Sequence, residues 1–179
     1  MKTEKVVVSQ KEGSSEKRLV FYDQKIDQVS NLASSFARLL KPTDALLLSG
    51  DIGSGKTFFA RKVIQRMMLN QGISVEEVPS PTFTIVQVYD LIIPAVWHLD
   101  LYRLSSFEEI IELGLEDGFD RGISLIEWPD RMGPYIPKRN ISINFHQGEA
   151  NFDSRTIVIE FHGMGWEDIT DGLIRKLLP

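Results

Sequence analysis

The sequence predicts an α/β fold in which a mixed sheet, with a parallel core and antiparallel additions, is flanked by helices. Three observations predict it. Short apolar runs bounded by turn residues alternate with segments in which apolar residues recur at helical spacing. One such run leads through a glycine-rich loop directly into a helical segment. Two segments near the C-terminus alternate apolar and polar residues, which is typical of an antiparallel pair at the side of a sheet.

Composition and length fit one globular domain. The chain has 179 residues, of which 42% are hydrophobic and 25% are charged, and domains cluster at about 100–150 residues. It contains no cysteine, which excludes a disulfide framework and a thiolate metal site. The net charge is −5, whereas proteins that hold nucleic acid mainly through its phosphates are usually basic. We therefore expect any contact with RNA to be indirect, through a partner.

The N-terminal stretch MKTEKVVVSQKEGSSEKR does not have the pattern of a secretory signal. It has only three apolar residues in a row, too few for the core of a secretory signal. No apolar run in the chain approaches the roughly 20 residues that span a bilayer. We expect a cytoplasmic protein with no membrane partner. Residues 1–17 are expected to form a polar tail, with a short strand at residues 6–8, and residues 18–179 a single domain.

Apolar spacing predicts the elements of the first half in order. Residues 25–40 present one apolar helical face. The apolar run Ala45–Ser49, bounded by turn residues, is predicted to be a buried strand. Residues 58–69 follow as a helix that ends at an Asn-Gln-Gly turn, and a proline-rich turn leads into a strand at residues 84–89.

The second half begins with AVWHLD, a strand that ends near Asp100. Residues 106–113 are predicted to be a short helix, with a serine N-cap and two glutamates at its positive end. GISLIEWP is a third buried strand, and NISINFH and RTIVIEFH are the antiparallel pair. WEDITDGLIRKLL is predicted to be a C-terminal helix. The order of strands and helices agrees with one sheet covered by helices.

The glycine-rich loop is the strongest functional signal. Residues 50–57, GDIGSGKT, match G-x-x-x-x-G-K-[ST], the phosphate-binding P-loop, and they follow a predicted strand and open a predicted helix. Glycines let successive backbone N–H groups face a phosphate, and the helix adds its positive end. The lysine reaches the β- and γ-phosphates, and the threonine hydroxyl ligates Mg²⁺. The expected nucleotide-binding residues are Gly50, Gly53, Ser54, Gly55, Lys56 and Thr57.

A P-loop site needs a further carboxylate at the end of a neighbouring buried strand. Asp100 ends AVWHLD, and Glu127 ends ISLIE. Either could bind the metal while the other orients the attacking water, and spacing does not decide between them. Each could instead cap its strand or pair with an arginine such as Arg103. Thr82, on the stiff turn PSPTFT, could sense a γ-phosphate, or the turn could be purely structural.

Five segments in this order and spacing resemble one family: GDIGSGKT, SPTFTIVQVYD, HLDLYRL, ELGLEDGF and ISLIEWPDRMG. It is the TsaE (YjeE) family of bacterial P-loop ATPases, which act in tRNA threonylcarbamoyladenosine biosynthesis. The resemblance implies a small mixed α/β ATPase that uses ATP and Mg²⁺ and binds the proteins TsaD and TsaB. ATP hydrolysis would support turnover by TsaD, which modifies the adenosine beside the anticodon of tRNAs that read ANN codons.

The resemblance also implies roles for single residues. Phosphate binding falls to residues 53–56, and Thr57 would bind both ATP and Mg²⁺. Glu127 matches the metal-site carboxylate and Asp100 the catalytic or water-positioning acid, so that Lys56, Asp100 and Glu127 are the expected catalytic residues. Thr82 matches the switch-like threonine, and Trp128 the tryptophan beside the nucleotide. His98 completes H-x-D, although a buried core histidine is an equal alternative.

Two departures from the family pattern stand out. The EDGF segment, residues 116–119, occupies a place where the family more often has an acidic residue followed by tyrosine. The family often has an arginine near the nucleotide in its C-terminal segment, where this chain offers Arg155 in DSRTIVIE, in an undetermined register.

Two other functions use the same loop. A small-molecule kinase usually needs an arginine-bearing lid, for which the stretch after Glu127 offers Arg131 and Arg139. A GTP-dependent switch would need Asn-Lys-x-Asp to recognise guanine, and this sequence has none. ATP is therefore favoured over GTP, and the partner-dependent ATPase over the kinase.

Overall fold

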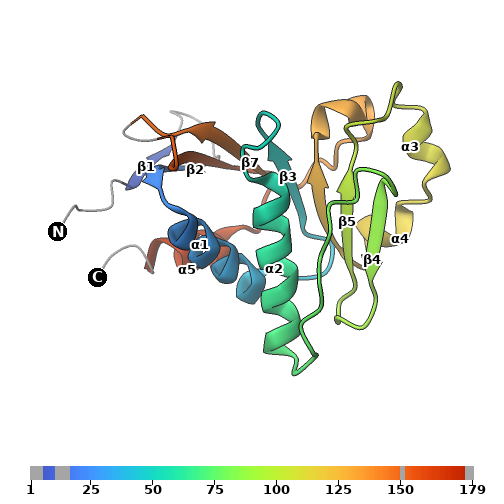
Figure 1. The fold of residues 1–179 in the computed structure, drawn as a ribbon, viewed down its shortest axis with the longest axis horizontal. Helices are drawn as coiled ribbons and strands as arrows, with labels where there is room; N and C mark the ends of the chain where they lie inside the picture. Colours follow the sequence, from blue (N-terminus) through green and yellow to red (C-terminus); the bar gives the residue numbers. More distant parts are fainter. Residues whose placement is uncertain (1–5, 11–16, 150–151, 176–179) are drawn as a thin grey trace.

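A computed structural model describes residues 6–10, 17–149 and 152–175. These residues form one eight-stranded mixed sheet in the order β1-β2-β8-β7-β3-β6-β5-β4, covered by helices on both faces (Figure 1). The strands are β1 (Val6–Gln10), β2 (Lys17–Gln24), β3 (Ala45–Ser49), β4 (Val86–Tyr89), β5 (Val96–Asp100), β6 (Ile123–Glu127), β7 (Asn140–Gln147) and β8 (Arg155–His162). The helices are α1 (Ile26–Leu39), α2 (Lys56–Asn70), α3 (Glu109–Glu112), α4 (Glu116–Asp120), α5 (Glu167–Arg175) and the 3₁₀ segment η1 (Pro129–Tyr135).

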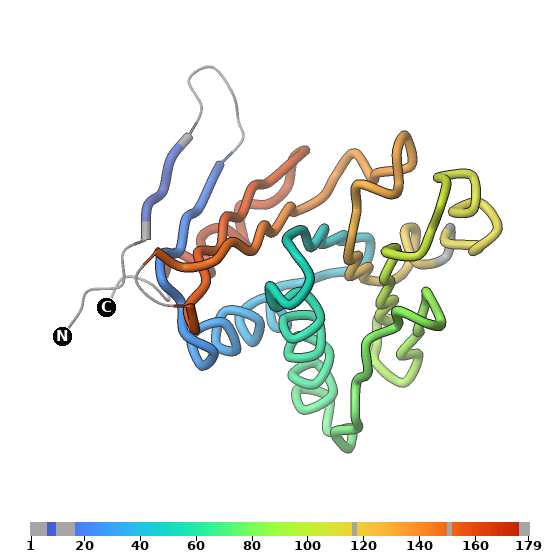
Figure 2. The backbone as a smooth tube through the Cα atoms, turned by 45° about the horizontal axis from the view of Figure 1, so that its top comes forward, coloured from blue at the N-terminus to red at the C-terminus, as the bar shows by residue number. Residues whose placement is uncertain are grey.

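The centre of the sheet is parallel and its two sides are antiparallel. β3 pairs in parallel with both β6 and β7, and β5 pairs in parallel with β6. The pairs β4–β5, β7–β8, β2–β8 and β1–β2 are antiparallel. Figure 2 shows β1 and β2, in blue, at one side of the molecule and the green segment of β4 and β5 at the other. The predicted fold class is confirmed.

Two hydrophobic clusters hold the helices against the sheet. The larger one joins α1, α2 and α5 to one face, and the rings of Phe36, Phe59 and Phe145 connect α1 through α2 to β7 within it. Successive ring centroids lie 5.7 Å and 5.5 Å apart in edge-to-face geometry, which is favourable for aromatic pairs. The smaller cluster packs the α3, α4 and η1 region on the other face, around Leu47 and Leu99. The α2 helix, which follows the P-loop, is thereby fixed on a rigid core.

Several predicted elements differ from the structure at their ends. The predicted strand at residues 84–89 begins only at Val86, because Ile85 has φ 66° and its N–H bonds the Pro81 carbonyl rather than a neighbouring strand. The predicted helix at residues 106–113 is reduced to α3. The Glu109 carboxylate accepts the N–H groups of Ser105 and Ser106, and this holds the preceding residues in turns.

The largest omission in the sequence-based prediction is β2. Its buried residues Leu19, Val20 and Phe21 lie where a strand was not expected. Strand β1, within the expected tail, reaches Gln10 rather than ending at residue 8, and it pairs with β2. The predicted C-terminal helix corresponds to α5, and the last three residues of the prediction lie outside the described part of the chain. Among the described residues, no helix is both long enough and apolar enough to cross a membrane.

Candidate active site

The P-loop connects β3 to α2 and depends on glycine backbone geometry. Gly50, Gly53 and Gly55 have φ angles of 138°, 76° and 112°, a region that side chains disfavour. At Gly50, a Cβ atom would lie 2.5 Å from the carbonyl oxygen of Phe145, so the backbone of β7 forms the floor of the loop. Helix α2 begins directly after Gly55, and its free N–H groups and positive end therefore belong to the loop.

Lys56 folds back over this loop. Its Nζ donates to the carbonyl oxygens of Gly50, at 2.7 Å, and Asp51, at 2.9 Å. The same ammonium lies 4.0 Å from the centre of the Trp128 ring. Burial lowers the pKa of the Lys56 ammonium, and the nearby Glu127 carboxylate opposes that shift. The ammonium is thus held against the backbone carbonyls of the P-loop.

The two expected carboxylates lie side by side. Asp100 and Glu127 end β5 and β6, and they are register partners in this parallel pair. Both are buried, at 3% and 2% exposure. Glu127 Oε2 accepts a hydrogen bond from the Thr57 hydroxyl at 2.8 Å, so this carboxylate faces the start of α2. Asp100 instead faces the loop that carries Thr82, whose hydroxyl donates to Asp100 Oδ2 at 2.5 Å.

The Pro-Ser-Pro-Thr loop is held against Asp100 by two hydroxyls. Ser80 Oγ lies 2.7 Å from Thr82 Oγ1 and donates to Asp100 Oδ2 at 3.2 Å. Arg103, which could have paired with a carboxylate, lies with its guanidinium carbon 4.3 Å from the centre of the Phe83 ring. Among the described ion pairs, none joins Arg103 to Asp100. This acid is therefore bonded to the proline-rich loop.

The role of His98, a site residue or a core histidine, was left open by the sequence. The side chain is fully buried, and Nε2 lies 2.9 Å from Glu127 Oε1. Because an ionised carboxylate only accepts hydrogen bonds, Nε2 carries the proton in this contact. Nδ1 is buried and has no hydrogen-bond partner among the described residues. Glu127 is thus held by two donors, one on each oxygen. The H-x-D motif already indicated that His98 belongs to the site, because residues two apart on a strand share a face and Asp100 is the register partner of Glu127.

Trp128 turns the chain back toward the loop. It follows β6 with φ 59° and ψ 52°, a left-handed conformation uncommon outside glycine. The backbone N–H of Trp128 donates to the Leu48 carbonyl at 3.2 Å. The centroid of its ring lies 5.1 Å from that of the Tyr102 ring. This geometry keeps the indole ring against Lys56.

Arg155, whose register the sequence left open, contacts the P-loop backbone. Its Nε donates to the Ser54 carbonyl at 2.9 Å, and Nη2 donates to the Gly53 carbonyl at 3.3 Å. Nη1 donates to the carbonyls of Phe152 and Ser154, both at 2.8 Å. The start of β8 is thereby bonded to the outer side of the loop.

The residues present suit a nucleotide with Mg²⁺. Ser54 Oγ is buried in the loop with no hydrogen-bond partner among the described residues, which leaves a donor for a phosphate oxygen. Thr57 and Glu127 bring a hydroxyl and a carboxylate together. Within residues 6–10, 17–149 and 152–175, no three His, Asp or Glu side chains form a metal cage. Mg²⁺ rarely uses such a cage, since it is usually held by one or two protein oxygens, waters and substrate phosphates.

Comparison with known proteins decides the family. Residues 24–157 match the family model described as threonylcarbamoyl adenosine biosynthesis protein TsaE. The chain belongs to the TsaE family. Its resemblance to that family, inferred from five motifs, is confirmed, and so is the involvement of the family in tRNA threonylcarbamoyladenosine biosynthesis.

Individual relatives give the same result. The chain is 41% identical to a TsaE protein of Rickettsia bellii over 118 residues, 66% of this chain and 79% of the relative. It is 30% identical to the TsaE protein of Bacillus subtilis over 148 residues, 82% of this chain and 86% of the relative. The crystal structure of Bacillus subtilis YdiB superposes with a TM-score of 0.73 at 27% identity, covering 92% of this chain and 99% of that one. The P-loop NTPase fold is therefore shared.

Proposed function

We propose that this chain is the ATP-binding and ATP-hydrolysing component of the tRNA threonylcarbamoyladenosine machinery. Its hydrolysis would support turnover of the TsaD–TsaB threonylcarbamoyl transferase on tRNAs that read ANN codons. The observation that carries the proposal is the position of Glu127, held between Thr57 and His98 with Asp100 beside it on the next strand. Family membership supplies the pathway, and this arrangement supports an ATPase within it.

In this proposal the P-loop binds the phosphates of ATP. The backbone N–H groups of residues 53–56 and the Ser54 hydroxyl would receive the phosphate oxygens. Lys56 would exchange its bonds to the Gly50 and Asp51 carbonyls for bonds to the β- and γ-phosphates. Trp128 would lie beside the nucleotide, because its ring already contacts the Lys56 ammonium.

Thr57 and Glu127 would hold Mg²⁺, directly or through water. When bound, the ion would neutralise charge on the phosphates during transfer. His98 would keep the Glu127 carboxylate in one orientation through its Nε2 proton. The Thr57 hydroxyl, which now donates to Glu127, would turn its oxygen toward the metal site.

Asp100 would orient the attacking water. It lies at the same register as Glu127 but contacts a different loop. The Thr82 hydroxyl donates to it, so the proline-rich loop would respond to what Asp100 binds. We assign the catalytic roles to Lys56, Asp100 and Glu127 on these grounds.

The wider setting is proposed from the family and the composition. Residues 18–179 would act as one ATPase domain after a polar segment of residues 1–17, in the cytoplasm and without a membrane partner. TsaD and TsaB would be its protein partners, and tRNA would be contacted only through that complex. The net charge of −5 agrees with an indirect contact with RNA.

The small-molecule kinase finds less support. The arginines after Glu127 that a kinase lid would need are both engaged. Arg131 Nε lies 3.7 Å from Asp130 Oδ2, and Arg139 Nη1 lies 2.6 Å from Oδ1 of the buried Asp44. Arg139 also stacks on Trp166, with its guanidinium carbon 3.5 Å from the ring centre.

One comparison tests the proposed function. ATP hydrolysis is measured for the chain alone and with the TsaD–TsaB pair, and modified adenosine on tRNA is counted per TsaD molecule. We expect slow hydrolysis alone, faster hydrolysis with the pair, and several turnovers of modification only when this chain and ATP are present. Many turnovers without this chain would refute the proposal. Rapid phosphate transfer to a metabolite would favour the kinase instead.

A further inference from the structure

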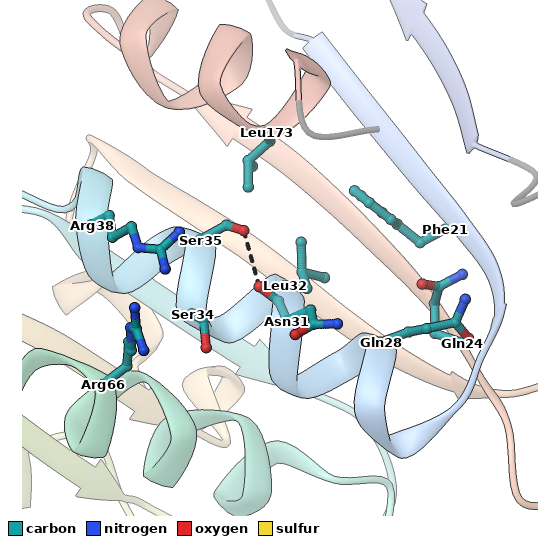
Figure 3. Close-up of a pocket in the computed structure, with 10 residues that line it drawn as sticks. All are labelled: Phe21, Gln24, Gln28, Asn31, Leu32, Ser34, Ser35, Arg38, Arg66 and Leu173. Atoms are coloured by element: carbon teal, nitrogen blue, oxygen red, sulfur yellow. Dashed lines mark hydrogen bonds between the residues drawn. The ribbon is translucent and has the colours of Figure 1, made fainter. Parts of the chain in front are cut away.

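A cavity lies away from the P-loop. It has a volume of about 380 Å³ and is bordered by residues of α1, α2, β2 and α5 (Figure 3). Arg66, on its α2 side, is ten residues beyond Lys56, so it lies about 15 Å along the helix at 1.5 Å per residue. None of the residues assigned above to ATP or Mg²⁺ lines this cavity. The cavity is therefore separate from the proposed ATP and Mg²⁺ site.

Two arginines meet in this cavity. Figure 3 shows Arg38, from α1, and Arg66, from α2, with both guanidinium groups directed into the same gap between the helices. Neither guanidinium has an ion-pair or hydrogen-bond partner among the described residues. The Nε atom of Arg66 is buried, and a buried N–H donor without a partner destabilises a fold. Arg38 is exposed, and Arg66 is half-buried.

The remaining lining supplies hydrogen-bonding groups but no negative charge. Amides and hydroxyls of residues such as Gln24, Asn31 and Ser34 face the cavity, and no Asp or Glu in the described part of the chain lines it. Ser35 bonds the Asn31 carbonyl at 2.9 Å, within the helix itself. A cavity with two positive charges and neutral polar walls suits an anion.

We propose that this cavity binds a small molecule through a phosphate group, with Arg38 and Arg66 as its two ligating side chains. A phosphate monoester carries a charge of about −1.5 to −2 at neutral pH, which matches two guanidiniums better than a single carboxylate does. The planar fork of arginine forms paired hydrogen bonds with phosphate oxygens. Binding would satisfy the buried Nε donor of Arg66.

A nucleic-acid backbone fits this site less well than a small molecule. A surface that follows successive phosphates needs a continuous basic stripe, and this chain has a net charge of −5. The positive charge in the cavity comes from two side chains at one end, with neutral groups over the rest of the lining. One phosphate group, with a polar body in the remaining volume, is the occupant that this distribution favours.

Titration with inorganic phosphate, followed by residue-resolved NMR, tests the proposal. The full ¹⁵N-labelled chain is titrated with phosphate, and chloride keeps the ionic strength constant. We expect saturable shifts of the amide signals of Asn31, Ser34 and Arg66, with a millimolar dissociation constant. The signals of Gly53 and Gly55 report the P-loop separately. The Lys56→Ala variant should lose the P-loop response and keep the response of the cavity.

Matched variants separate a built site from general charge attraction. Arg38→Ala and Arg66→Ala should each weaken phosphate binding at the cavity at least about tenfold, which is 1.4 kcal/mol. Arg66→Lys keeps the charge without the fork and should fall between Arg66→Ala and the wild type. Lys62→Ala removes a charge from the same helix outside the cavity. Its binding constant should change less than about twofold, since the Lys62 side chain does not line the cavity.

Three outcomes would overturn the proposal. The first is a cavity response that is absent or fails to saturate. The second is an equal loss in Lys62→Ala and Arg66→Ala, which would show general charge attraction. The third is a response of the α1 and α2 signals to tRNA but not to phosphate, which would assign the cavity to RNA. The proposed ATPase function is measured by other assays, so its failure would leave this result intact.

Discussion

The hydroxyl of Thr57 donates a hydrogen bond to the carboxylate of Glu127, 2.8 Å away, across 70 residues of sequence. Thr57 belongs to the P-loop motif, which follows β3. Glu127 ends β6, the buried strand that pairs with β3 in the sheet. This contact joins the phosphate-binding half of the candidate site to its acidic half. Substitutions on the two sides of the contact test the two halves of the site separately.

Glu127→Gln should stop hydrolysis and leave nucleotide binding largely intact. The amide keeps the shape of the side chain but removes the charge that would hold Mg²⁺. We expect the hydrolysis rate to fall about 100-fold, since charge stabilisation by a bound metal is worth several kcal/mol. Rate and ADP affinity are measured together, with the exposed Asp130→Asn as control. Normal hydrolysis by Glu127→Gln would show that the metal assignment is wrong.

His98→Phe should impair the use of Mg²⁺ rather than the binding of ATP. Phenylalanine fills similar space but removes the donor to Glu127 Oε1. Loss of a group that orients a metal ligand typically costs 10–100-fold in metal affinity or activity. We expect a correspondingly higher Mg²⁺ concentration for half-maximal hydrolysis. ADP affinity without Mg²⁺ should be unchanged. His98→Gln, which can still donate, should recover part of the loss, whereas equal loss in both variants would point to packing alone.

Arg155→Ala should weaken ATP binding by removing hydrogen bonds that hold the P-loop backbone. The variant loses the charged donors to the Ser54 and Gly53 carbonyls. Hydrogen bonds to charged groups contribute about 1.5–3 kcal/mol, and partial exposure places this one at the lower end. We expect about tenfold weaker ATP binding and faster amide hydrogen exchange at residues 53–56. Arg18→Ala, which removes an exposed arginine paired with Glu160, is the control. Unchanged exchange in the loop would contradict this prediction.

Tyr89→Phe should stabilise the protein by about 1 kcal/mol at neutral pH. The Tyr89 hydroxyl is buried with no hydrogen-bond partner among the described residues, so its removal relieves a desolvation cost. Burial also raises the pKa of Tyr89 to about 12, from an ordinary value of 10.0. Denaturant unfolding of both proteins measures the difference in the free energy of unfolding. A variant less stable than the wild type at pH 7 would contradict the prediction.

The same substitution should change the response to alkali. Between the unfolded pKa near 10 and the folded pKa near 12, the unfolded chain loses the Tyr89 proton while the folded protein retains it. The free energy of unfolding of the wild type therefore does not depend on this proton below about pH 10, and it decreases as the pH rises from about 10 to about 12. The phenylalanine variant has no such proton. Its stability advantage should grow from pH 10 to pH 12.

The local features of the site were predictable from the sequence. The P-loop pattern needs only eight consecutive residues, and in the structure they run from the end of β3 into the first turn of α2. Asp100 and Glu127 each end an apolar run, and parallel strands bring their carboxyl ends to one edge of a sheet. The structure confirms that these two residues are neighbours. Their chemical roles stay predictions.

Contacts between distant parts of the chain were not predictable in the same way. The bond from Arg155 to Ser54 spans 101 residues, and its existence depends on the register of β8 in the sheet. Strand β2 was missed for a similar reason. Its apolar residues are few and flanked by charges, and it becomes a strand through pairing with β8, which is far away in sequence. His98 forms a hydrogen bond with Glu127 only because β5 lies beside β6.

The backbone of Phe145 beneath Gly50, described above as the floor of the P-loop, has a consequence for biosynthesis. The ribosome makes the phosphate-binding motif long before it makes β7 and the start of β8, which support that motif from below and from the side. A nascent chain that has emerged only as far as Glu127 carries the whole motif and both acids but lacks this support. The P-loop can therefore acquire its full set of supporting contacts only after Arg155 has been synthesised.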